Sequence, residues 1–580
     1  MLCTGARILL ESLKREGVDL FFGYPGGAVI DIYDELSNHP DLRHILVRHE
    51  QGAVHAADGY ARACGKVGVC LATSGPGATN TVTGIATAYS DSIPMVIFTG
   101  QVSTPLIGND AFQEVDIIGI TRPCTKHNFL VKDVKDLAET VRKAFYLARS
   151  GRPGPVLVDI PKNIQQASCE FVWPEDVVMR SYCPTFRANL NQLRRAMDVL
   201  VTSRKPLIVA GGGVIMANAA EELCTLAHLM HAPVCSTLMG LGAFPGDDPL
   251  WIGMLGMHGT FAANRAVTQA DVILAVGARF DDRVTGKLSQ FAPNARIVHI
   301  DIDPTTLRKN VRVEVPVVSD ALSALQGLRS ILESGHAQKD WAGDHADWMG
   351  QVLEWQKEHP LSWAKGDVLK PQQVVERMYE ITKGEAIITT EVGQNQMWAA
   401  QFYKYHKPRT YLTSGGLGTM GYGLPAAIGA QMAFPDRLVV DVAGDGSIQM
   451  NIQELATAVL EELPIVCCIF NNTYLGMVRQ WQKLFYGKRY AMTNLKAGAL
   501  SRRTDGQEYP EYTPDFIRLA ESYGAKGIRV TEKDQIAAAF EEAKKNTKTP
   551  TIIEFIIDPE EMVYPMVKPG GTLADLIMDC

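Results

Sequence analysis

Several features are absent from this sequence. None of its 11 cysteines forms a Cys-X-X-Cys pair and the count is odd, which indicates a reducing, intracellular compartment rather than a disulfide scaffold. No apolar run approaches the roughly 18 residues that a membrane-spanning helix needs. The first 27 residues carry early charges and an amphipathic pattern, unlike a secretory signal. We therefore expect a cytoplasmic protein that does not associate with membranes.

A basic excess is also absent. Lys and Arg total 56 against 64 Asp and Glu, so the formal net charge is -8, which argues against a nucleic-acid partner. The chain has 580 residues, of which 46% are hydrophobic and 21% charged, an ordinary globular composition. A chain of this length exceeds one core, and roughly three or four domains of about 150 residues are expected. Cys467 and Cys468 lie in an apolar run and are expected to pack as small hydrophobic residues.

The pattern of apolar runs divides the chain into three similar stretches and a tail. Residues 1–165, 190–330 and 371–557 alternate short β-branched runs with longer amphipathic ones, and a tail covers 558–580. This alternation is typical of βαβ units around a parallel sheet. Polar connections separate the stretches, the second of them at about 335–370. The predicted fold class is α/β, with three doubly wound parallel-sheet domains.

Two strands of the third stretch end in polar groups. The pattern predicts strands over 438–442 and 464–470 with a helix over 452–460 between them. A Gly-Asp-Gly group at 444–446 follows the first strand, and an Asn pair at 471–472 ends the second. Because a right-handed crossover makes the strands parallel, their carboxyl ends share one edge of the sheet. We therefore expect these polar groups to lie close together.

The chemistry of these groups favours a metal-bridged diphosphate. One carboxylate, Asp445, with one amide oxygen, Asn472, suits Mg²⁺, which takes few protein oxygens and completes its octahedron with phosphate oxygens and water. Gly446 would let the following backbone approach a phosphate closely. Each group alone is a weak signal, since Asp-Gly is a common turn. Their placement at the two strand ends makes the combination strong.

A second phosphate-type pattern lies nearby. The stretch "GLGTMG" at 416–421 matches the dinucleotide pattern, and Asp441 lies 20 residues beyond it. Against a dinucleotide site, Pro425 occurs early in the following helix, and Asp441 falls in the strand that leads to the Gly-Asp-Gly group. We therefore favour the metal-bridged diphosphate site.

The spacing is similar to the thiamin diphosphate motif, in which GDG precedes NN by some 24 residues; here Ser447 to Phe470 are 24 residues. Thiamin chemistry also needs an acid outside this domain, because a carboxyl group bonded to the pyrimidine ring in a dry pocket drives it to its imino form. Glu50, at the end of a predicted strand in "ILVRHEQGAVHAADGYAR", is the candidate. The alternative for Glu50 is a simple charge complement at a helix start. His49 and His55 are interpreted as surface or core residues.

Motifs along residues 1–570 resemble the catalytic large subunit of acetohydroxyacid synthase, in the order of that family. They include "FGYPGGAVIDIYD", "GNDAFQEVD", "GARFDDRVTGK", "SGGLGTMGYGLPAAIGA" and "LGMVRQWQ". The resemblance implies the three-domain thiamin diphosphate fold with thiamin diphosphate, Mg²⁺ and FAD as cofactors. It implies that pyruvate is decarboxylated and its hydroxyethyl unit transferred to a second pyruvate or to 2-ketobutyrate. The products would be 2-acetolactate or 2-aceto-2-hydroxybutyrate, precursors of the branched-chain amino acids.

The resemblance assigns catalytic roles to matching positions. Glu50 would activate the cofactor, and Gln113 would approach the reacting centre. Met420 would lie under the cofactor and force its V shape. Arg283 would pair with the carboxylate of the second ketoacid, a task suited to its planar fork, and Trp481 would shape the acceptor pocket.

The resemblance also assigns cofactor ligands. Asp445 and Asn472 would hold Mg²⁺ by their side chains, with the Tyr474 carbonyl as third protein ligand, and Gly418 would accept a hydrogen bond from the pyrimidine amine. The other positions expected around thiamin diphosphate are Gln394, Asn395, Gly444, Gly446 and Ser447. Those expected around FAD are Arg152, Gly211, Gly212, Gly213, His258, Gly259, Gly277, Arg279, Asp301 and Asp320. By themselves these glycine turns indicate only a nucleotide-sized ligand or structural turns; "RFDDRVTG" favours the FAD-containing biosynthetic branch.

Two segments depart from the family pattern. Family members usually have "GQHQMW" where this chain has "GQNQMW" at 393–398, so Asn395 is expected to donate a hydrogen bond to a diphosphate oxygen without the charge of a protonated His. The stretch between Arg489 and Pro514 is longer and more polar than the usual connection. It is either a lid or a surface insertion, and we favour the insertion.

Alternatives to the synthase remain at this stage. A glyoxylate carboligase would share the fold and FAD, but that family carries an apolar residue at the position of Glu50. A pyruvate oxidase would use FAD for electron transfer, and a non-catalytic regulator would not require Glu50, Asp445 and Asn472. In the family the glutamate and the diphosphate site come from different subunits, so a homodimer or homotetramer with interfacial sites is expected. The sequence leaves open whether a small regulatory subunit binds.

Overall fold

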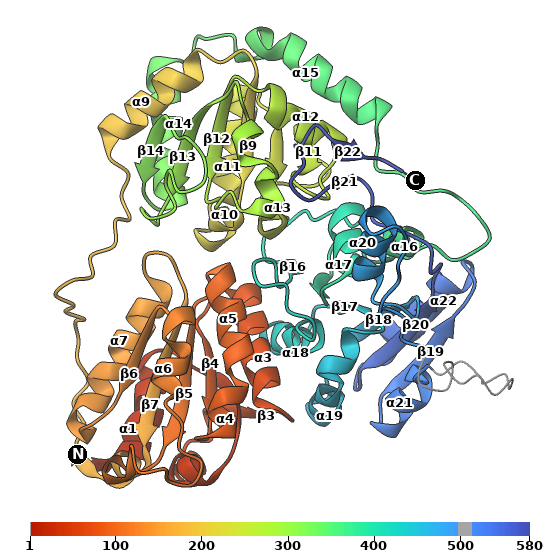
Figure 1. Ribbon diagram of the computed structural model, residues 1–580. Coiled ribbons are helices and arrows are strands. Elements are labelled where there is room, and N and C mark those ends of the chain that lie inside the picture. Colours follow the sequence, from red (N-terminus) through yellow and green to blue (C-terminus); the bar gives the residue numbers. More distant parts are fainter. Residues whose placement is uncertain (1, 497–512, 580) are drawn as a thin grey trace, which may run out of the picture.

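The computed structural model describes residues 2–496 and 513–579, and three six-stranded parallel sheets form its framework. Figure 1 shows the three sheets as separate lobes, each surrounded by helices. The expected α/β class with three parallel-sheet domains is therefore confirmed. No helix in the described ranges is long and apolar enough to cross a membrane.

The first sheet has the strand order β3-β2-β4-β5-β7-β6. Its strands are β2 (Leu20–Tyr24), β3 (Arg43–Leu46), β4 (Gly68–Ala72), β5 (Met95–Gln101), β6 (His127–Leu130) and β7 (Pro155–Pro161). Three of its helices bear on function: α3 (Glu50–Cys64), α4 (Pro76–Asn80) and α5 (Val82–Asp91). Outside the sheet, β1 (Leu2–Thr4) pairs with β8 (Ser168–Glu170), so the N-terminal unit continues a few residues past 165.

The third sheet repeats this topology, with the order β16-β15-β17-β18-β20-β19. Its strands are β15 (Ile387–Thr390), β16 (Tyr411–Leu412), β17 (Val439–Gly444), β18 (Val466–Asn471), β19 (Lys526–Val530) and β20 (Thr551–Ile556). In both sheets the strand order reverses next to the first strand. Ligands of open α/β sheets bind at the carboxyl edge beside such a switch point.

The middle sheet differs and has the order β11-β10-β9-β12-β13-β14. Its strands are β9 (Pro206–Ala210), β10 (Val234–Ser236), β11 (Trp251–Met254), β12 (Val272–Val276), β13 (Arg296–Asp301) and β14 (Val315–Val318). Counted within the domain this is 3-2-1-4-5-6, the order of dinucleotide-binding sheets, with the switch point between β9 and β12. The glycine turns Gly211–Gly213 and Gly277 follow those two strands.

The N-terminal and C-terminal domains contact each other through α3 and α18 (Gly423–Ala433), which lie side by side in Figure 1. Glycines allow the two helix backbones to touch. A Cβ atom at Gly429 would lie 1.9 Å from the Ala56 carbonyl oxygen, and one at Gly59 would lie 2.3 Å from the Ala426 carbonyl oxygen. The relative position of these domains is therefore set by backbone contact.

The connection at 335–370 contains a helix that the sequence analysis did not predict, α15 (Trp341–Glu358). Trp341 and Trp348 are buried, and Trp348 donates a hydrogen bond from Nε1 to the Pro206 carbonyl at 2.8 Å. Trp341, Trp348 and Trp355 are spaced seven apart, two helical turns, so they share the face that packs on the middle domain. The connection thus contains a helix whose tryptophans pack on the middle domain, which its largely polar composition did not indicate.

The tail after residue 557 crosses to the middle domain, where Figure 1 shows it beside β11 and α12 (Phe261–Gln269). Its strands β21 (Met566–Val567) and β22 (Leu576–Ile577) form an antiparallel pair. The Val567 amide donates to the Met257 carbonyl at 2.8 Å, and the Lys287 amide to the Gly571 carbonyl at 2.9 Å. The tail thus joins the C-terminal and middle domains.

The contact between α3 and α18 leads to a stability prediction. We expect Gly429→Ala to lower the melting temperature, because the added methyl group must displace backbone and overpacking costs about 1–3 kcal/mol. The matched control is Gly350→Ala in α15, where nothing lies within 4 Å of the new Cβ. Because Ala favours helix, the control should stabilise by about 0.5–1 kcal/mol. Equal melting temperatures of the two variants would contradict the packing argument.

Candidate active site

The carboxyl ends of β17 and β18 bring Asp445 and Asn472 together. The strands are parallel neighbours with Gly444 opposite Phe470. Asp445 and Asn472 are both buried, and the backbone N–H groups of Gly446 and Thr473 lie near the Asp445 carboxylate, where they favour its charged form. The Tyr474 amide donates to Asn472 Oδ1 at 3.0 Å. The Asp445 carboxylate therefore faces the loop that Asn472 begins.

The electrostatics of Asp445 fit a bound cation. Burial raises the pKa of this carboxyl to about 7, and the charge of another acid, Glu554, raises it further. The ion pairs of the described residues include none with Asp445. A buried carboxylate in a negative field, next to an amide oxygen and backbone carbonyls, is the donor set that Mg²⁺ prefers.

The Gly-Asp-Gly turn packs tightly around this acid. Ser447 Oγ accepts a hydrogen bond from the Gly444 amide at 3.2 Å and donates to the Gly444 carbonyl at 3.2 Å. A Cβ atom at Gly446 would lie 3.0 Å from Leu475 and 4.0 Å from Met420 Cε. Met420 therefore lies against the turn that carries the candidate metal ligand.

Gln394 and Asn395 begin α17 (Gln394–Phe402) at the end of β15. Asn472 Nδ2 donates to Gln394 Oε1 at 3.3 Å, so Gln394 adjoins the metal-ligand candidates. Asn395 Nδ2 donates to the Glu391 and Val442 carbonyls at 2.9 and 2.7 Å. A side-chain amide has two N–H groups, and both are used here. The structure therefore differs from the expectation that Asn395 donates to a diphosphate oxygen.

A cavity of about 600 Å³ lies between the three domains. Gly418, Met420, Arg283 and Trp481 line it from the C-terminal and middle domains. Arg283, in α13 (Asp282–Thr285), places its guanidinium 5.9 Å from the Trp481 ring centroid. Trp481 lies in α20 (Gly476–Phe485), so these two residues meet despite their separation in sequence.

Eight of the ten positions expected around FAD line the same cavity. These are Arg152, Gly212, Gly213, His258, Gly277, Arg279, Asp301 and Asp320. Gly211 and Gly259 do not line it: a Cβ at Gly211 would lie 2.1 Å from the Gly277 carbonyl oxygen, and one at Gly259 2.6 Å from the Met254 carbonyl oxygen. These two glycines permit close packing of the turns instead.

Burial shifts the pKa values of two side chains that line this cavity, His258 and Asp301. Burial lowers the pKa of His258 to about 4, so its ring is neutral, and its Nδ1 lies 3.1 Å from the Pro565 carbonyl of the tail. Burial raises the pKa of Asp301 to about 6. Arg152 donates from Nε to Ser92 Oγ at 2.8 Å and pairs with Asp303 at 3.2 Å. Its guanidinium therefore has a fixed direction.

Glu50 and Gln113 form a separate group on the N-terminal domain. Glu50 is buried at the start of α3 and accepts a hydrogen bond from Asn80 Nδ2 at 2.9 Å. Gln113 has a φ of 59°. A Cβ atom placed on Gly75 would lie 2.8 Å from the Gln113 carbonyl oxygen, so the backbones of these two residues pack closely together. Both flank the turn of α4, and neither lines the cavity that holds Met420. Within one chain, the predicted site residues thus fall into two groups.

The first residues of the expected insertion lie against the Asn472 loop. The Leu475 amide donates to the Thr493 carbonyl at 2.8 Å, and the Leu495 amide donates to the Thr473 carbonyl at 2.9 Å. Thr493 is buried. Residues 497–512, which hold most of the expected insertion, lie outside the described residues.

The dinucleotide alternative at 416–421 is wrong. Asp441 has no exposed surface and accepts a hydrogen bond from Thr389 Oγ1 at 3.1 Å. It lies inside the third sheet, where no ribose can reach it, and α18 begins at Gly423 with Asp441 Oδ1 close to its backbone. The glycines of this stretch serve a loop that faces the cavity.

Comparison with known proteins agrees with this geometry. Models of the thiamine pyrophosphate enzymes match three parts of the chain: the N-terminal TPP binding domain over 3–120, the central domain over 193–328 and the C-terminal TPP binding domain over 391–555. The acetolactate synthase isozyme 3 large subunit of Escherichia coli K12 is 48% identical over 99% of this chain and 98% of its own length.

Other relatives give the same result. The acetolactate synthase large subunit of Corynebacterium glutamicum is 48% identical over 99% of this chain and 90% of its own length. The probable acetolactate synthase large subunit of Methanocaldococcus jannaschii is 48% identical over 99% of this chain and 95% of its own length. The resemblance seen in the motifs is confirmed, and the chain belongs to the acetolactate synthase large-subunit family of thiamine pyrophosphate enzymes.

Proposed function

We propose that this protein is the catalytic subunit of an acetohydroxyacid synthase, which joins the two-carbon unit of pyruvate to a second 2-ketoacid. Membership of the acetolactate synthase family over nearly the whole chain supports this activity. The observation that carries the proposal is the Asp445 carboxylate facing the Asn472 loop at adjacent strand ends. Bound thiamin diphosphate supplies the nucleophilic carbon and the electron sink for decarboxylation.

The metal site in this proposal consists of three groups. Asp445 and Asn472 would bind Mg²⁺ through side-chain oxygens, and Tyr474 through its carbonyl. The cation would neutralise the buried Asp445 carboxylate and hold the diphosphate at the edge of the sheet. Gln394 would keep Asn472 in place, because its Oε1 accepts from Asn472 Nδ2.

Glu50 would hold a proton at the ring nitrogen of the aminopyrimidine. Asn80 donates a hydrogen bond to Glu50 Oε2 and so fixes the direction of that oxygen. Glu50 Oε1 lies close to Gly77, where an added Cβ atom would be only 3.1 Å away. Burial excludes water from this carboxylate, which strengthens its hydrogen bond to the ring.

The acceptor side of the site would be formed by Arg283 and Trp481. The planar guanidinium of Arg283 can form two parallel hydrogen bonds to the carboxylate of the second ketoacid. Because this guanidinium lies over the Trp481 ring, its possible orientations are restricted. The indole would shape the space beside the keto carbon and so influence the choice between pyruvate and 2-ketobutyrate.

We extend the proposal to FAD in the cavity between the domains. Four of the eight lining positions, Gly212, Gly213, Gly277 and Arg279, follow the two strands at the switch point of the middle sheet, whose strand order is that of dinucleotide-binding domains. Arg152 and Arg279 would meet the negative phosphates, and the exposed backbone of Gly212 and Gly213 would allow their close approach.

The complete site in this proposal requires two chains. Glu50 and Gln113 do not line the cavity of their own chain, so a second copy would supply them to Met420 and the metal ligands. Several relatives are named large subunits, which supports a small subunit as a further partner of this chain.

The proposed activity is tested by product analysis. With pyruvate, 2-ketobutyrate, thiamin diphosphate, Mg²⁺ and FAD, we expect 2-acetolactate and 2-aceto-2-hydroxybutyrate, and loss of both products when Mg²⁺ is chelated. Acetate or acetyl phosphate instead would identify a pyruvate oxidase, and product from glyoxylate alone would identify a glyoxylate carboligase. Absence of any product would contradict the proposal.

The role of Glu50 is tested by Glu50→Gln. We expect the rate of acetolactate formation to fall by about 100-fold or more, because Gln cannot share a proton with the ring nitrogen. The control is Glu139→Gln on the same domain, whose side chain is 57% exposed and should leave the rate unchanged. A Glu50→Gln enzyme as fast as the control would refute the role.

The interfacial site is tested by mixing two inactive variants. Glu50→Gln and Asp445→Asn should each have little activity. In a mixed dimer one site carries both changes and the other carries neither. Co-expression should therefore restore about one quarter of the wild-type rate. If the mixture stays as inactive as its components, both residues act within one chain.

A further inference from the structure

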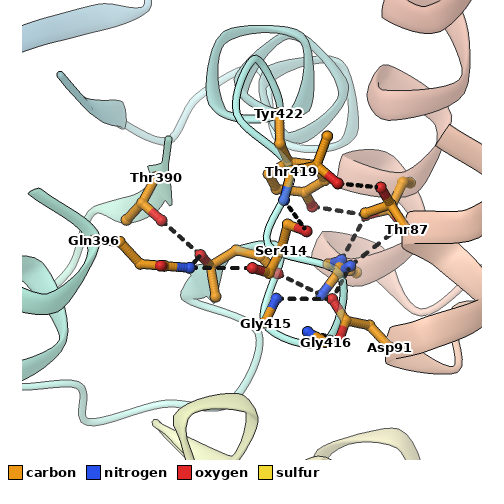
Figure 2. A network of polar contacts seen from close by, with 12 residues as sticks. Thr87, Asp91, Thr390, Gln396, Ser414, Gly415, Gly416, Thr419 and Tyr422 are labelled. Carbon is orange, nitrogen blue, oxygen red and sulfur yellow. Dashed lines mark hydrogen bonds and ion pairs between the residues drawn. The ribbon is translucent and has the colours of Figure 1, made fainter. Parts of the chain in front are cut away.

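A polar network joins the N-terminal domain to the loop formed by residues 413–422 of the same chain. Figure 2 shows Asp91 and Thr87 reaching from one domain toward Gly415, Gly416 and Thr419 of the other. The Asp91 carboxylate accepts hydrogen bonds from the Gly415 and Gly416 amides at 3.0 and 2.7 Å. Thr87 Oγ1 lies 2.7 Å from Thr419 Oγ1.

Arg62 orients the Asp91 carboxylate and also holds the two ends of the loop. Its NH2 donates to Asp91 Oδ2 at 3.0 Å, and its NH1 donates to the Thr413 carbonyl at 2.8 Å. Its Nε donates to Asp58 Oδ1 at 2.5 Å, and the same oxygen accepts from the Tyr422 hydroxyl at 2.7 Å. The Asp58 and Asp91 side chains have no exposed surface, so water does not weaken these bonds.

The C-terminal domain holds the other side of the loop. Glu391, which has no exposed surface, accepts from the Gly421 and Gly423 amides at 2.5 and 2.9 Å. Gln396 donates to Thr413 Oγ1 at 2.7 Å and to the Ser414 carbonyl at 3.2 Å. One buried carboxylate from each domain therefore fixes the backbone of this loop.

Asp91 occupies a position that local forces disfavour. It is the last residue of α5, where the negative end of the helix dipole repels a carboxylate. The next residue, Ser92, is in the left-handed region with φ of 62°. Such local conflicts occur in native proteins mainly where function requires them. The compensating contacts of Asp91 are Arg62 and the loop amides.

The loop between the two carboxylates presents Gly418 and Met420 to the cavity, and Met420 Cε adjoins the Gly446 turn. We propose that Asp91 is a positioning residue for the carboligase reaction: oriented by Arg62, it sets the loop so that Gly418 and Met420 meet the bound cofactor. This inference rests on the proposed function of the site. Removal of the Asp91 charge would let the loop shift, and a misplacement of about 1 Å can cost about 100-fold in rate.

The test is Asp91→Asn in the full-length holoenzyme. We expect a fall in kcat of at least tenfold, toward about 100-fold, with the KM for pyruvate changed little. The dissociation constant of thiamin diphosphate, followed by quenching of tryptophan fluorescence with Mg²⁺ present, should rise. The asparagine amide can offer one acceptor to the two glycine amides but brings an N–H group toward Arg62 or the loop.

The matched control is Asp159→Asn. Asp159 is another buried carboxylate of the N-terminal domain, bonded to Thr99 and Gln101 and without contact to residues 413–422. Its kcat and thiamin diphosphate affinity should stay within about twofold of wild type. A loss as large as that of Asp91→Asn would overturn the proposal, because any buried carboxylate would then have the same effect. Wild-type kcat and affinity in Asp91→Asn would also overturn it.

A second variant serves if Asp91→Asn does not fold. Thr87→Val removes one hydroxyl from the contact with Thr419 and keeps the side-chain shape, so kcat should fall by severalfold at an unchanged melting temperature. An unchanged kcat in Thr87→Val would then overturn the proposal. If the wild-type protein forms no acetohydroxyacid, the proposed function fails. The positioning role of Asp91 is then tested by the affinity for thiamin diphosphate alone. This affinity must weaken in Asp91→Asn and stay unchanged in Asp159→Asn.

Discussion

Parallel strands that are linked by right-handed crossovers end at the same edge of their sheet, and this constraint assembles the site. It places Gln394, Asp445 and Asn472 together, although they follow three different strands. The same constraint gathers the glycine turns of the middle domain at its switch point. The middle and C-terminal domains turn this edge toward a common cavity, which can combine a diphosphate site with space for a nucleotide. The N-terminal domain lines the same cavity with residues that precede β5 and β7, such as Asp91 and Arg152.

The two buried acids Asp445 and Asp91 differ in their partners. Burial raises the pKa of the Asp445 carboxyl to about 7, and no basic side chain within residues 2–496 and 513–579 forms an ion pair with it, so this carboxylate is suited to bind a cation from solution. Asp91 is buried as deeply but has Arg62 and two backbone amides as permanent partners. Of these two carboxylates, Asp445 is therefore available to a ligand, whereas Asp91, whose oxygens are paired, holds backbone in place.

Sequence patterns predicted the central strands, the fold class and the meeting of Asp445 with Asn472, because these follow from apolar runs and crossover geometry. The strands β6 and β16 were missed: β6 is short and half-exposed, and β16 has only two residues, so neither shows a clear periodicity. The hydrogen bonds of Asn395 and the role of Asp91 depend on contacts between distant segments. Nothing in the local sequence "AYSDSIP" distinguishes the acid from an ordinary turn residue.

Helix α3 carries a functional group at each end: Glu50 begins it, and Arg62 lies in its last turn. Its 15 residues span about 22 Å, and at Gly59 and Gly429 it touches α18 without an intervening side chain. A tilt that displaces Glu50 must therefore displace Arg62 as well, because a helix bends little over this length. In an assembly where those two ends serve different catalytic centres, α3 therefore couples the position of Glu50 in one centre to the position of Arg62 in the other.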